Sequence, residues 1–144
     1  MKIKINKKPR VFSVGIANKF QVKDFGKIFL NTNEQITFIN NNKEYDFGMK
    51  NWGYYATPSI NGRLKNNGYK TFLVKNIYNK IYIMVVNNLK IDSFEDYINY
   101  EKHKILLRLD NFTNEEDLIK SIKEINTKNK LCERLKCRKI GKNI

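Results

Sequence analysis

The first fifty residues alternate between apolar and polar positions, which is the period of a strand with one buried face. Turn-forming residues divide this alternation into five segments, at residues 2–6, 10–16, 26–31, 35–40 and 44–49. The asparagine run that ends the fourth segment predicts a tight turn, because asparagine tolerates a positive φ. The pattern therefore predicts an antiparallel meander, in which 26–31 and 35–40 form a hairpin.

A second group of strand patterns follows residue 68. Residues 69–76 and 80–87 predict the clearest hairpin of the chain, joined by a short connection. Residues 80–87 are apolar on both faces, which predicts a central strand that is covered on both sides. Residues 103–110 return to a strand pattern after an intervening helix.

Two helices are predicted in the last third of the chain. The first begins at Asp92 or Ser93, either of which is a suitable N-cap, and its apolar residues recur at helical spacing in Phe94, Tyr97 and Ile98. The second, over residues 113–126, begins with a capping box made by Thr113 and Glu116.

The order of these elements predicts the α+β class. The fold is an antiparallel sheet or a partly closed barrel built from the first ~90 residues, with covering helices, the longest of them near the C-terminus. A chain of 144 residues can bury a core in one domain. We therefore expect a single α+β domain over residues 1–127 and a basic C-terminal tail over 128–144, whose weak amphipathic pattern is compatible with a short helix.

The formal net charge is +14, and it is concentrated at the two ends of the chain. Residues 1–10 carry +5 and residues 128–144 carry +6, which leaves +3 for the 117 residues between them. Basic ends favour a polyanionic partner, either nucleic acid or an anionic membrane face. The alternative is that the lysine excess reflects AT-rich coding and not a function. Lysine outnumbers arginine 23 to 5 and asparagine occurs 21 times, a composition that AT-rich codons produce.

Several classes of protein have no signature in this sequence. The apolar runs are strand-sized, well short of the about 20 residues of a membrane span, and no apolar stretch follows the basic N-terminus, so we expect a cytoplasmic protein. Cys132 and Cys137 diverge on a helix and are interpreted as reduced thiols, and the single histidine, His103, as a surface residue. Asp46 is interpreted as an outward-facing charge on its strand. We therefore predict no catalytic residue, metal or cofactor.

Residues 50–68, KNWGYYATPSINGRLKNNG, hold the only tryptophan and a recognisable helix start. Thr57 is a suitable N-cap, Pro58 suits the first helical position, and Gly68 suits a left-handed C-terminal cap. The aromatic residues before this helix have two interpretations: packing at a strand end, or a ligand site in which the free N–H groups of the helix start face an anion. The second interpretation predicts ligand contacts by Trp52, Tyr54, Tyr55, Ser59, Asn61, Arg63 and Lys65.

The stretch WGYYATPSINGRLKNNGYKTFLVKN, followed by a hydrophobic strand, resembles a block of short bacterial proteins that are associated with surface-polysaccharide gene sets. The resemblance covers roughly residues 24–110. It implies a role in surface-glycan biosynthesis and transfers no catalytic residue.

Three functions are compatible with these observations, and binding is favoured over catalysis. The first is a small non-enzymatic binding module for an anionic partner, with nucleic acid as the leading candidate. The second is an accessory protein or small enzyme of surface-glycan biosynthesis that binds a nucleotide-sugar or an anionic sugar, and the third is a structural or protein-interaction domain. The first function predicts nucleic-acid contacts by Lys7, Lys8, Arg10, Arg134, Lys136, Arg138 and Lys139.

Overall fold

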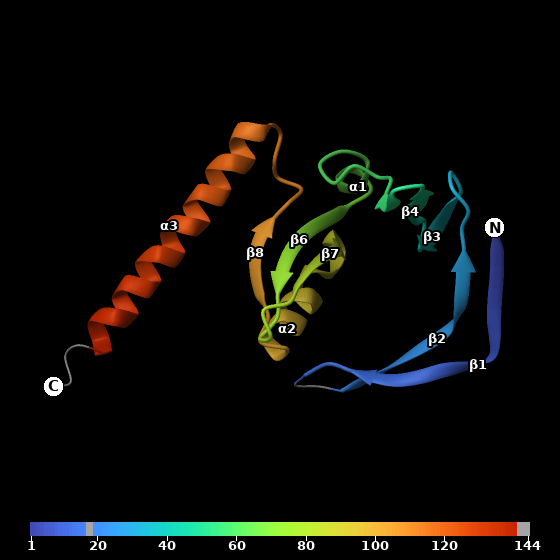
Figure 1. Ribbon diagram of the computed structural model, residues 1–144, viewed down its shortest axis with the longest axis horizontal. Helices are drawn as coiled ribbons and strands as arrows, with labels where there is room; N and C mark the ends of the chain where they lie inside the picture. The colour runs from blue at the N-terminus through green and yellow to red at the C-terminus, as the bar shows by residue number, and fades with distance from the viewer. Residues whose placement is uncertain (17–18, 141–144) are drawn as a thin grey trace. The chain divides into compact units, whose positions relative to one another are not determined.

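A computed structural model describes residues 1–16 and 19–140, with side chains up to residue 127 (Figure 1). The chain divides into two compact units, residues 1–110 and residues 111–144. The content is mixed, and the strands pair in antiparallel fashion, as expected. Within the described residues the strands form three separate sheets and no closed barrel. The predicted domain over 1–127 and tail over 128–144 stay a prediction.

The first sheet is a long hairpin of β1 (Lys2–Val14) and β2 (Phe20–Phe29). The expected hairpin between 26–31 and 35–40 is therefore wrong, because β2 pairs back onto β1. The turn chemistry after β2 explains the difference. Glu34 accepts a hydrogen bond from the Asn31 backbone N–H at 2.7 Å, and the Asn33 N–H donates to the Met49 carbonyl at 2.8 Å, so the chain turns toward the next sheet.

An irregularity interrupts this hairpin between Ile5 and Arg10. Pro9 lies inside it and has no N–H to donate to a ladder. Gly26, opposite Ile5, has φ +155°, and a Cβ built on it would lie 2.0 Å from the Lys4 carbonyl oxygen. The close backbone approach at this point therefore requires glycine.

The second sheet has the order β3 (Gln35–Asn40), β4 (Lys43–Lys50) and β5 (Gly53–Ala56). Asn41 and Asn42 connect β3 to β4 with φ of 48° and 65°, which confirms the asparagine turn. The helix expected from Thr57 is wrong, because α1 (Arg63–Asn66) is a single turn. Gly68 adopts the expected left-handed conformation, with φ 78°.

The third sheet has the order β7 (Ile81–Asn87), β6 (Tyr69–Lys75) and β8 (Lys104–Arg108). The predicted hairpin of β6 and β7 is confirmed. The predicted central position of β7 is wrong, because β6 lies between its two neighbours and β7 is an edge strand. Ile81 and Ile83 of β7 are accordingly 58% and 63% exposed.

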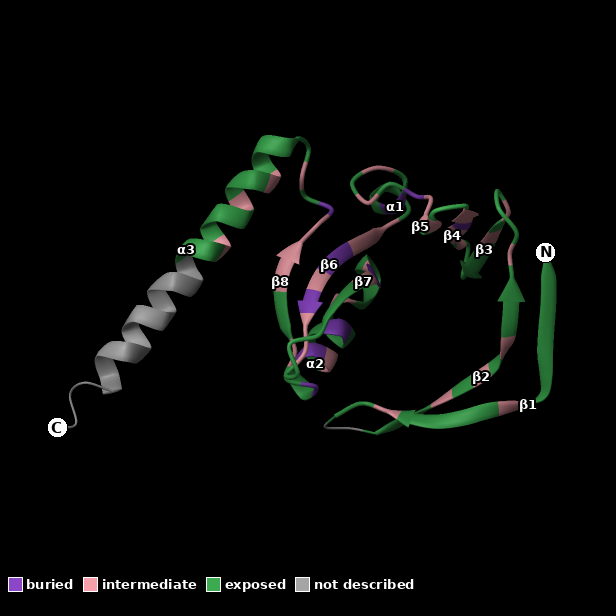
Figure 2. Cartoon of the chain, viewed as in Figure 1, coloured by how far each residue is buried: buried purple, intermediate pink, exposed green. Residues whose placement is uncertain are grey.

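The core of the first unit lies between this sheet and α2 (Ile91–Tyr100), as the buried residues in Figure 2 show. It contains Phe72, Val74, Val86, Phe94 and Ile98. The helix is entered through a single 3₁₀ turn, η1 (Asn88–Lys90). The Asn87 side chain caps this turn by accepting from the Leu89 N–H at 3.1 Å, so the expected N-cap at Asp92 or Ser93 is wrong.

The second unit contains α3 (Glu115–Ile140), the longest of the helices, as expected. Its N-cap is Asn114, whose side chain accepts from the Asp117 N–H at 2.9 Å. Thr113 instead donates to the Asp117 carboxylate at 2.8 Å, so the expected capping box with Glu116 is wrong. None of the described helices is both long and apolar enough to span a membrane. Cys132 and Cys137 lie outside the residues whose side chains are described.

Candidate functional site

The β1–β2 hairpin carries half of the formal charge of the chain. Residues 1–29 hold eight lysine and arginine side chains and one carboxylate, a net charge of +7 against +14 for the whole sequence. None of the described residues of this segment is buried, and most are exposed (Figure 2). A strongly basic ribbon of two strands is therefore accessible to a polyanion.

The register of the outer half of the hairpin separates two kinds of side chain. Residues paired across an antiparallel ladder share a face, and successive residues alternate between faces. One face carries the cations and an aromatic ring: Lys2, Lys4, Lys27 and Phe29. The other face is apolar: Ile3, Ile5 and Ile28. The basic side chains of this half are therefore gathered on one side of the ribbon.

Exposed phenylalanine rings are interleaved with these cations. Four rings are between 41% and 57% exposed: Phe12, Phe20, Phe25 and Phe29. The Lys4 ammonium lies 5.6 Å from the centroid of the Phe29 ring, and the Arg10 guanidinium carbon lies 5.5 Å from that of Phe12. Accessible rings beside cations are the combination with which proteins hold stacked bases and the phosphates between them.

Three of the predicted nucleic-acid contacts lie on this hairpin. Lys7 and Lys8 are exposed in the irregular segment that has no partner in register. The exposed Arg10 donates to the Asp24 carboxylate at 2.7 Å, so part of its charge is compensated within the hairpin. The other four predicted contacts lie outside the residues whose side chains are described: Arg134, Lys136, Arg138 and Lys139.

The hairpin carries further cations that were not among the predicted contacts. These cations are Lys2, Lys4, Lys19, Lys23 and Lys27. The signal was present for the first two, because the alternation of residues 2–6 already places both lysines on one face. The signal was absent for the last two, because their place beside β1 depends on a pairing that the sequence did not reveal.

The predicted ligand contacts from Trp52 to Tyr55 form a partly exposed aromatic group at β5. Trp52 is 70% exposed and Tyr54 is 61% exposed, so the tryptophan is outside the core. The rings of Trp52 and Tyr55 lie 5.7 Å apart, whereas Tyr54 stacks on Phe47 at the same distance. The aromatic side chains are therefore accessible at this point, in two separate pairs.

The predicted ligand contacts from Ser59 to Lys65 do not surround a helix start. The N–H of Arg63, the first residue of α1, donates to the Ser59 hydroxyl at 3.1 Å. The expected display of N–H groups at a helix start is therefore wrong, because α1 begins only at Arg63 and is four residues long. Asn61, which precedes this helix, and Lys65, which lies within it, are exposed. The seven residues stay predicted ligand contacts.

Asp46 is buried, so the prediction of an outward-facing charge is wrong. Its carboxylate accepts a hydrogen bond from the Thr37 hydroxyl at 2.7 Å and is ion-paired with Arg63. The Thr37 hydrogen bond holds the pKa of Asp46 below its ordinary value, assisted by Arg63 and opposed by burial. The pair fixes the chain between β5 and α1 onto β4, and it occupies the guanidinium that was expected to face a ligand.

A pocket of about 370 Å³ lies between the end of β1, the β6–β7 hairpin and α2. Its titratable residues are Tyr78, Tyr82, Tyr97, Glu101 and His103. Glu101 is buried and accepts a hydrogen bond from the Ile16 backbone N–H, which attaches the end of β1 to the end of α2. We call this the tyrosine pocket.

His103 is half-buried in the wall of the tyrosine pocket, so the prediction of a surface residue is wrong. Its Nε2 lies 3.4 Å from the Tyr97 hydroxyl, and its buried Nδ1 has no hydrogen-bond partner among the described residues. Burial raises the pKa of Tyr97, with smaller contributions from Glu101 and Tyr82, so the Tyr97 hydroxyl keeps its proton at neutral pH. The pocket therefore places the protonated Tyr97 hydroxyl and the His103 ring among other aromatic side chains.

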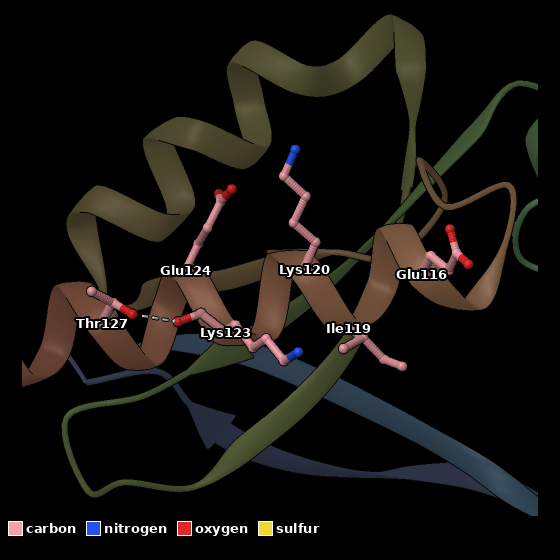
Figure 3. A pocket seen from close by; sticks show the side chains of 6 residues that line it. All are labelled: Glu116, Ile119, Lys120, Lys123, Glu124 and Thr127. Atoms are coloured by element: carbon pink, nitrogen blue, oxygen red, sulfur yellow. Dashed lines mark hydrogen bonds between the residues drawn. The ribbon is translucent and has the colours of Figure 1, made fainter.

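A larger hollow of about 560 Å³ lies along α3 (Figure 3). Its described lining comes from that helix alone and mixes both signs of charge: Glu116, Ile119, Lys120, Lys123, Glu124 and Thr127. The Thr127 hydroxyl donates to the Lys123 carbonyl at 2.9 Å, so it bonds its own helix. One helix face with compensated charges gives no converging set of ligand contacts.

The comparisons with protein-family models, with curated proteins and with solved structures find no match to this chain. Among residues 1–16 and 19–127, no group of three or more histidine, cysteine, aspartate or glutamate side chains is arranged to hold a metal ion.

Proposed function

We propose that this protein is a nucleic-acid-binding module whose main contact surface is the β1–β2 hairpin. The observation that supports this proposal is the interleaving of cations and exposed rings on the ribbon, which carries +7 within 29 residues. Phosphates neutralised by lysine and arginine supply most of the affinity, and rings supply base stacking. A two-stranded ribbon is also narrow enough to enter the major groove of a duplex.

The spacing of the cations suits a phosphate backbone. Lys2 and Lys4 point to the same side of β1, and two residues of a strand extend over about 6.8 Å. Successive phosphates of one strand rise by about 3.4 Å along a duplex, so two lysines on one face match two phosphate intervals. Lys27, paired with Lys4 across the ladder, widens this row into a patch.

The basic C-terminal tail is a second, separate element that we propose to contact nucleic acid. It contributes Arg134, Lys136, Arg138 and Lys139 within residues 128–144, which carry +6. These positions lie in the C-terminal half of α3. The first turn of the same helix carries Glu115, Glu116 and Asp117. We expect them to add electrostatic attraction that is independent of base sequence.

The salt dependence of binding tests the proposal. A labelled single-stranded oligonucleotide and a labelled duplex are titrated with the protein at several salt concentrations, with fluorescence anisotropy as the measurement. The affinity should fall linearly on a log–log plot. For the variant Lys7→Gln/Lys8→Gln, the plot of log affinity against log salt concentration on single strands should be shallower by about 1.4. Each lost phosphate contact removes about 0.7 from the steepness of this slope.

The matched control is Lys90→Gln/Lys104→Gln, which removes the same charge at exposed positions of the same unit outside the hairpin. The control should keep nearly the wild-type slope. Equal slopes for the two double variants would show that net charge and not the hairpin sets the affinity. Absence of salt-dependent binding to either oligonucleotide would contradict the proposed function as a whole.

A second candidate function is the binding of a nucleotide-sugar or an anionic sugar at β5. Its support is the exposed pair of Trp52 and Tyr55, since aromatic rings stack on sugar rings, together with the resemblance of residues 24–110. Trp52→Ala is the suitable variant, because Arg63→Ala would also break the ion pair with Asp46. A nucleotide-sugar panel should raise the melting temperature of the wild type and not of the variant, and no shift in the wild type would remove this candidate.

A further inference from the structure

The tyrosine pocket and the basic hairpin are parts of one continuous piece of chain. Val14, Gly15 and Ile16 at the end of β1 form one wall of the pocket. Arg10 precedes Val14 by four residues, or about 13 Å of strand. A strand of nucleic acid whose phosphates follow β1 therefore arrives at the mouth of this pocket.

The charges of the pocket differ in sign from those of the hairpin. No lysine or arginine is present in the described lining, and the buried carboxylate of Glu101 lies in its wall. A phosphate group is disfavoured at this point, because the described lining offers it a carboxylate and no lysine or arginine. An uncharged ligand group is favoured inside, with the phosphates left on the cations of the hairpin.

The shape and the walls of the pocket suit a planar ring. Its volume of about 370 Å³ is at the lower end of small-molecule sites. Tyr78, Tyr82 and Tyr97 give it aromatic walls, and the rings of Tyr97 and His103 meet edge to face at 5.5 Å. The turn that carries Tyr78 is fixed, since the Asn76 side chain accepts from the Tyr78 and Lys80 N–H groups, each at 2.9 Å.

The pocket also contains a buried polar atom without a partner. His103 Nδ1 is shielded from solvent and has no hydrogen-bond partner among the described residues. A buried nitrogen in this state costs free energy, which is recovered when the imidazole ring turns and brings it to a donor or an acceptor of a ligand in the pocket. The edges of nucleobases carry both kinds of group.

We propose that the tyrosine pocket binds one unpaired nucleobase of the strand whose phosphates lie along the β1–β2 hairpin. This inference rests on the proposed function and adds to it a preference for single strands. The base stacks against the tyrosine rings, and its polar edge bonds the His103 ring nitrogen. A base that is paired inside a duplex cannot enter, because it must first leave the stack.

The test uses a thymidine oligonucleotide with one 2-aminopurine, a fluorescent base, and the full-length protein. Stacking of 2-aminopurine on tyrosine quenches its emission, so we expect quenching when the wild type binds. Tyr78→Ala/Tyr82→Ala should abolish the quenching and weaken single-strand binding about tenfold, the effect of losing one stacked base. Duplex affinity should stay unchanged, because the hairpin cations remain in place.

The control variant is Tyr100→Ala, which removes a tyrosine that is 62% exposed on α2 and outside the pocket, and it should leave the quenching intact. His103→Phe keeps an aromatic ring in the wall and removes both nitrogens, so it should keep the quenching and lose any preference between adenine and thymine at the probed position. Circular dichroism establishes that each variant is folded before it is compared.

The outcomes separate this inference from the proposed function. Salt-dependent binding without quenching, or an equal loss of single-strand and duplex affinity in the double tyrosine variant, overturns the base pocket and leaves the hairpin interface standing. Free adenosine that binds as tightly as the oligonucleotide overturns the assignment of the pocket to a strand. No binding of either nucleic acid removes both ideas together.

Discussion

The hairpin of β1 and β2 and the sheet that contains β6 use similar residues in opposite ways. In the second region, Phe72 stacks on Phe94 with ring centroids 5.0 Å apart, and Val74 is fully buried. In the hairpin, phenylalanine rings of the same size are about half exposed and lie among lysines. The contrast separates rings that stabilise the fold from rings that are available to a partner.

The two regions also differ in what holds them together. The sheet of β7, β6 and β8 is covered on one face by α2 and contains the buried apolar cluster of the unit. The hairpin has two strands and no buried residue among those described, and isolated two-stranded hairpins are marginally stable in water. A ribbon of this kind gains stability when a partner covers it, which agrees with its proposed role in binding.

The largest expected difference in stability is between variants that replace one phenylalanine with alanine in each region. Phe72→Ala should destabilise the protein by about 3–5 kcal/mol, because it opens a cavity in the core. Phe25→Ala, at a ring that is 57% exposed on the hairpin, should change the free energy of unfolding by less than about 0.5 kcal/mol. Urea denaturation followed by circular dichroism measures both.

Binding should show the reverse order. Phe25→Ala should weaken single-strand affinity by about 1–3 kcal/mol if its ring stacks on a base. Phe72→Ala, measured at a temperature and a urea concentration where the variant is folded, should bind with unchanged affinity. If the hairpin ring affects stability as strongly as the core ring, the division between the two regions is wrong.

Asp46→Asn should have the next largest effect, because it breaks a structural ion pair in the second sheet. The variant loses the charge that Arg63 and Thr37 contact, and we expect a loss on the order of 2 kcal/mol in the free energy of unfolding. Nucleic-acid affinity should not change if Arg63 is structural. A large loss of affinity without a loss of stability would return Arg63 to the ligand site.

The ion pair of Asp46 and Arg63 should also make the free energy of unfolding depend on pH, which is a smaller effect. The pKa of Asp46 is lowered in the folded protein, so the unfolded chain, with a carboxyl pKa near 3.9, binds the proton more readily. The stabilisation is therefore complete above about pH 4 and is lost as the pH falls through the lower folded value. The wild type should lose stability in this range more steeply than Asp46→Asn, measured by urea denaturation between about pH 2.5 and 6. Asp110 acts in the same direction and remains in both proteins, since Arg108 and the Thr71 N–H lower its pKa against the opposing effect of burial.

The sequence predicted strands well and their partners poorly, for a physical reason. Period-two alternation indicates that a segment is a strand with one buried face. The same alternation is compatible with any neighbouring strand as its hydrogen-bonded partner. The β3–β4 hairpin was predictable because Asn41 and Asn42 specify the turn themselves. The pairing of β2 with β1 was not, since the bulge opposite Gly26 and the hydrogen bond from the Asn33 N–H to the Met49 carbonyl involve contacts distant in the sequence.

The two candidate sites differ in the same way. The cations of residues 1–10 were visible as a charge cluster, and the common face of Lys2 and Lys4 follows from alternation alone, whereas the place of Lys27 depends on the pairing of β2 with β1. The tyrosine pocket draws on residues from Val14 to His103, which only the folded chain brings together. Glu101 was not singled out from the sequence, and its position under the end of β1 involves a tertiary hydrogen bond that its carboxylate accepts from the Ile16 N–H.

The most local expected effect comes from Gly26→Ala, which should damage the hairpin and leave the core folded. The added Cβ would lie 2.0 Å from the Lys4 carbonyl oxygen, so the two backbones must separate at the bulge. We expect faster amide hydrogen exchange across β1 and β2, unchanged exchange in β6, and a weaker affinity for nucleic acid. The hairpin and the core should therefore respond independently to this change.

Gly53→Ala is the matched control, because Gly53 also has a positive φ, of 138°, but a Cβ there meets no atom within 4 Å. The two variants share the conformational strain and differ in the steric clash. If Gly26→Ala alone loses affinity while β6 stays protected, the hairpin is the binding element and is separable from the core. If both variants lose affinity equally, the nucleic-acid surface extends to β5, where Trp52 is exposed.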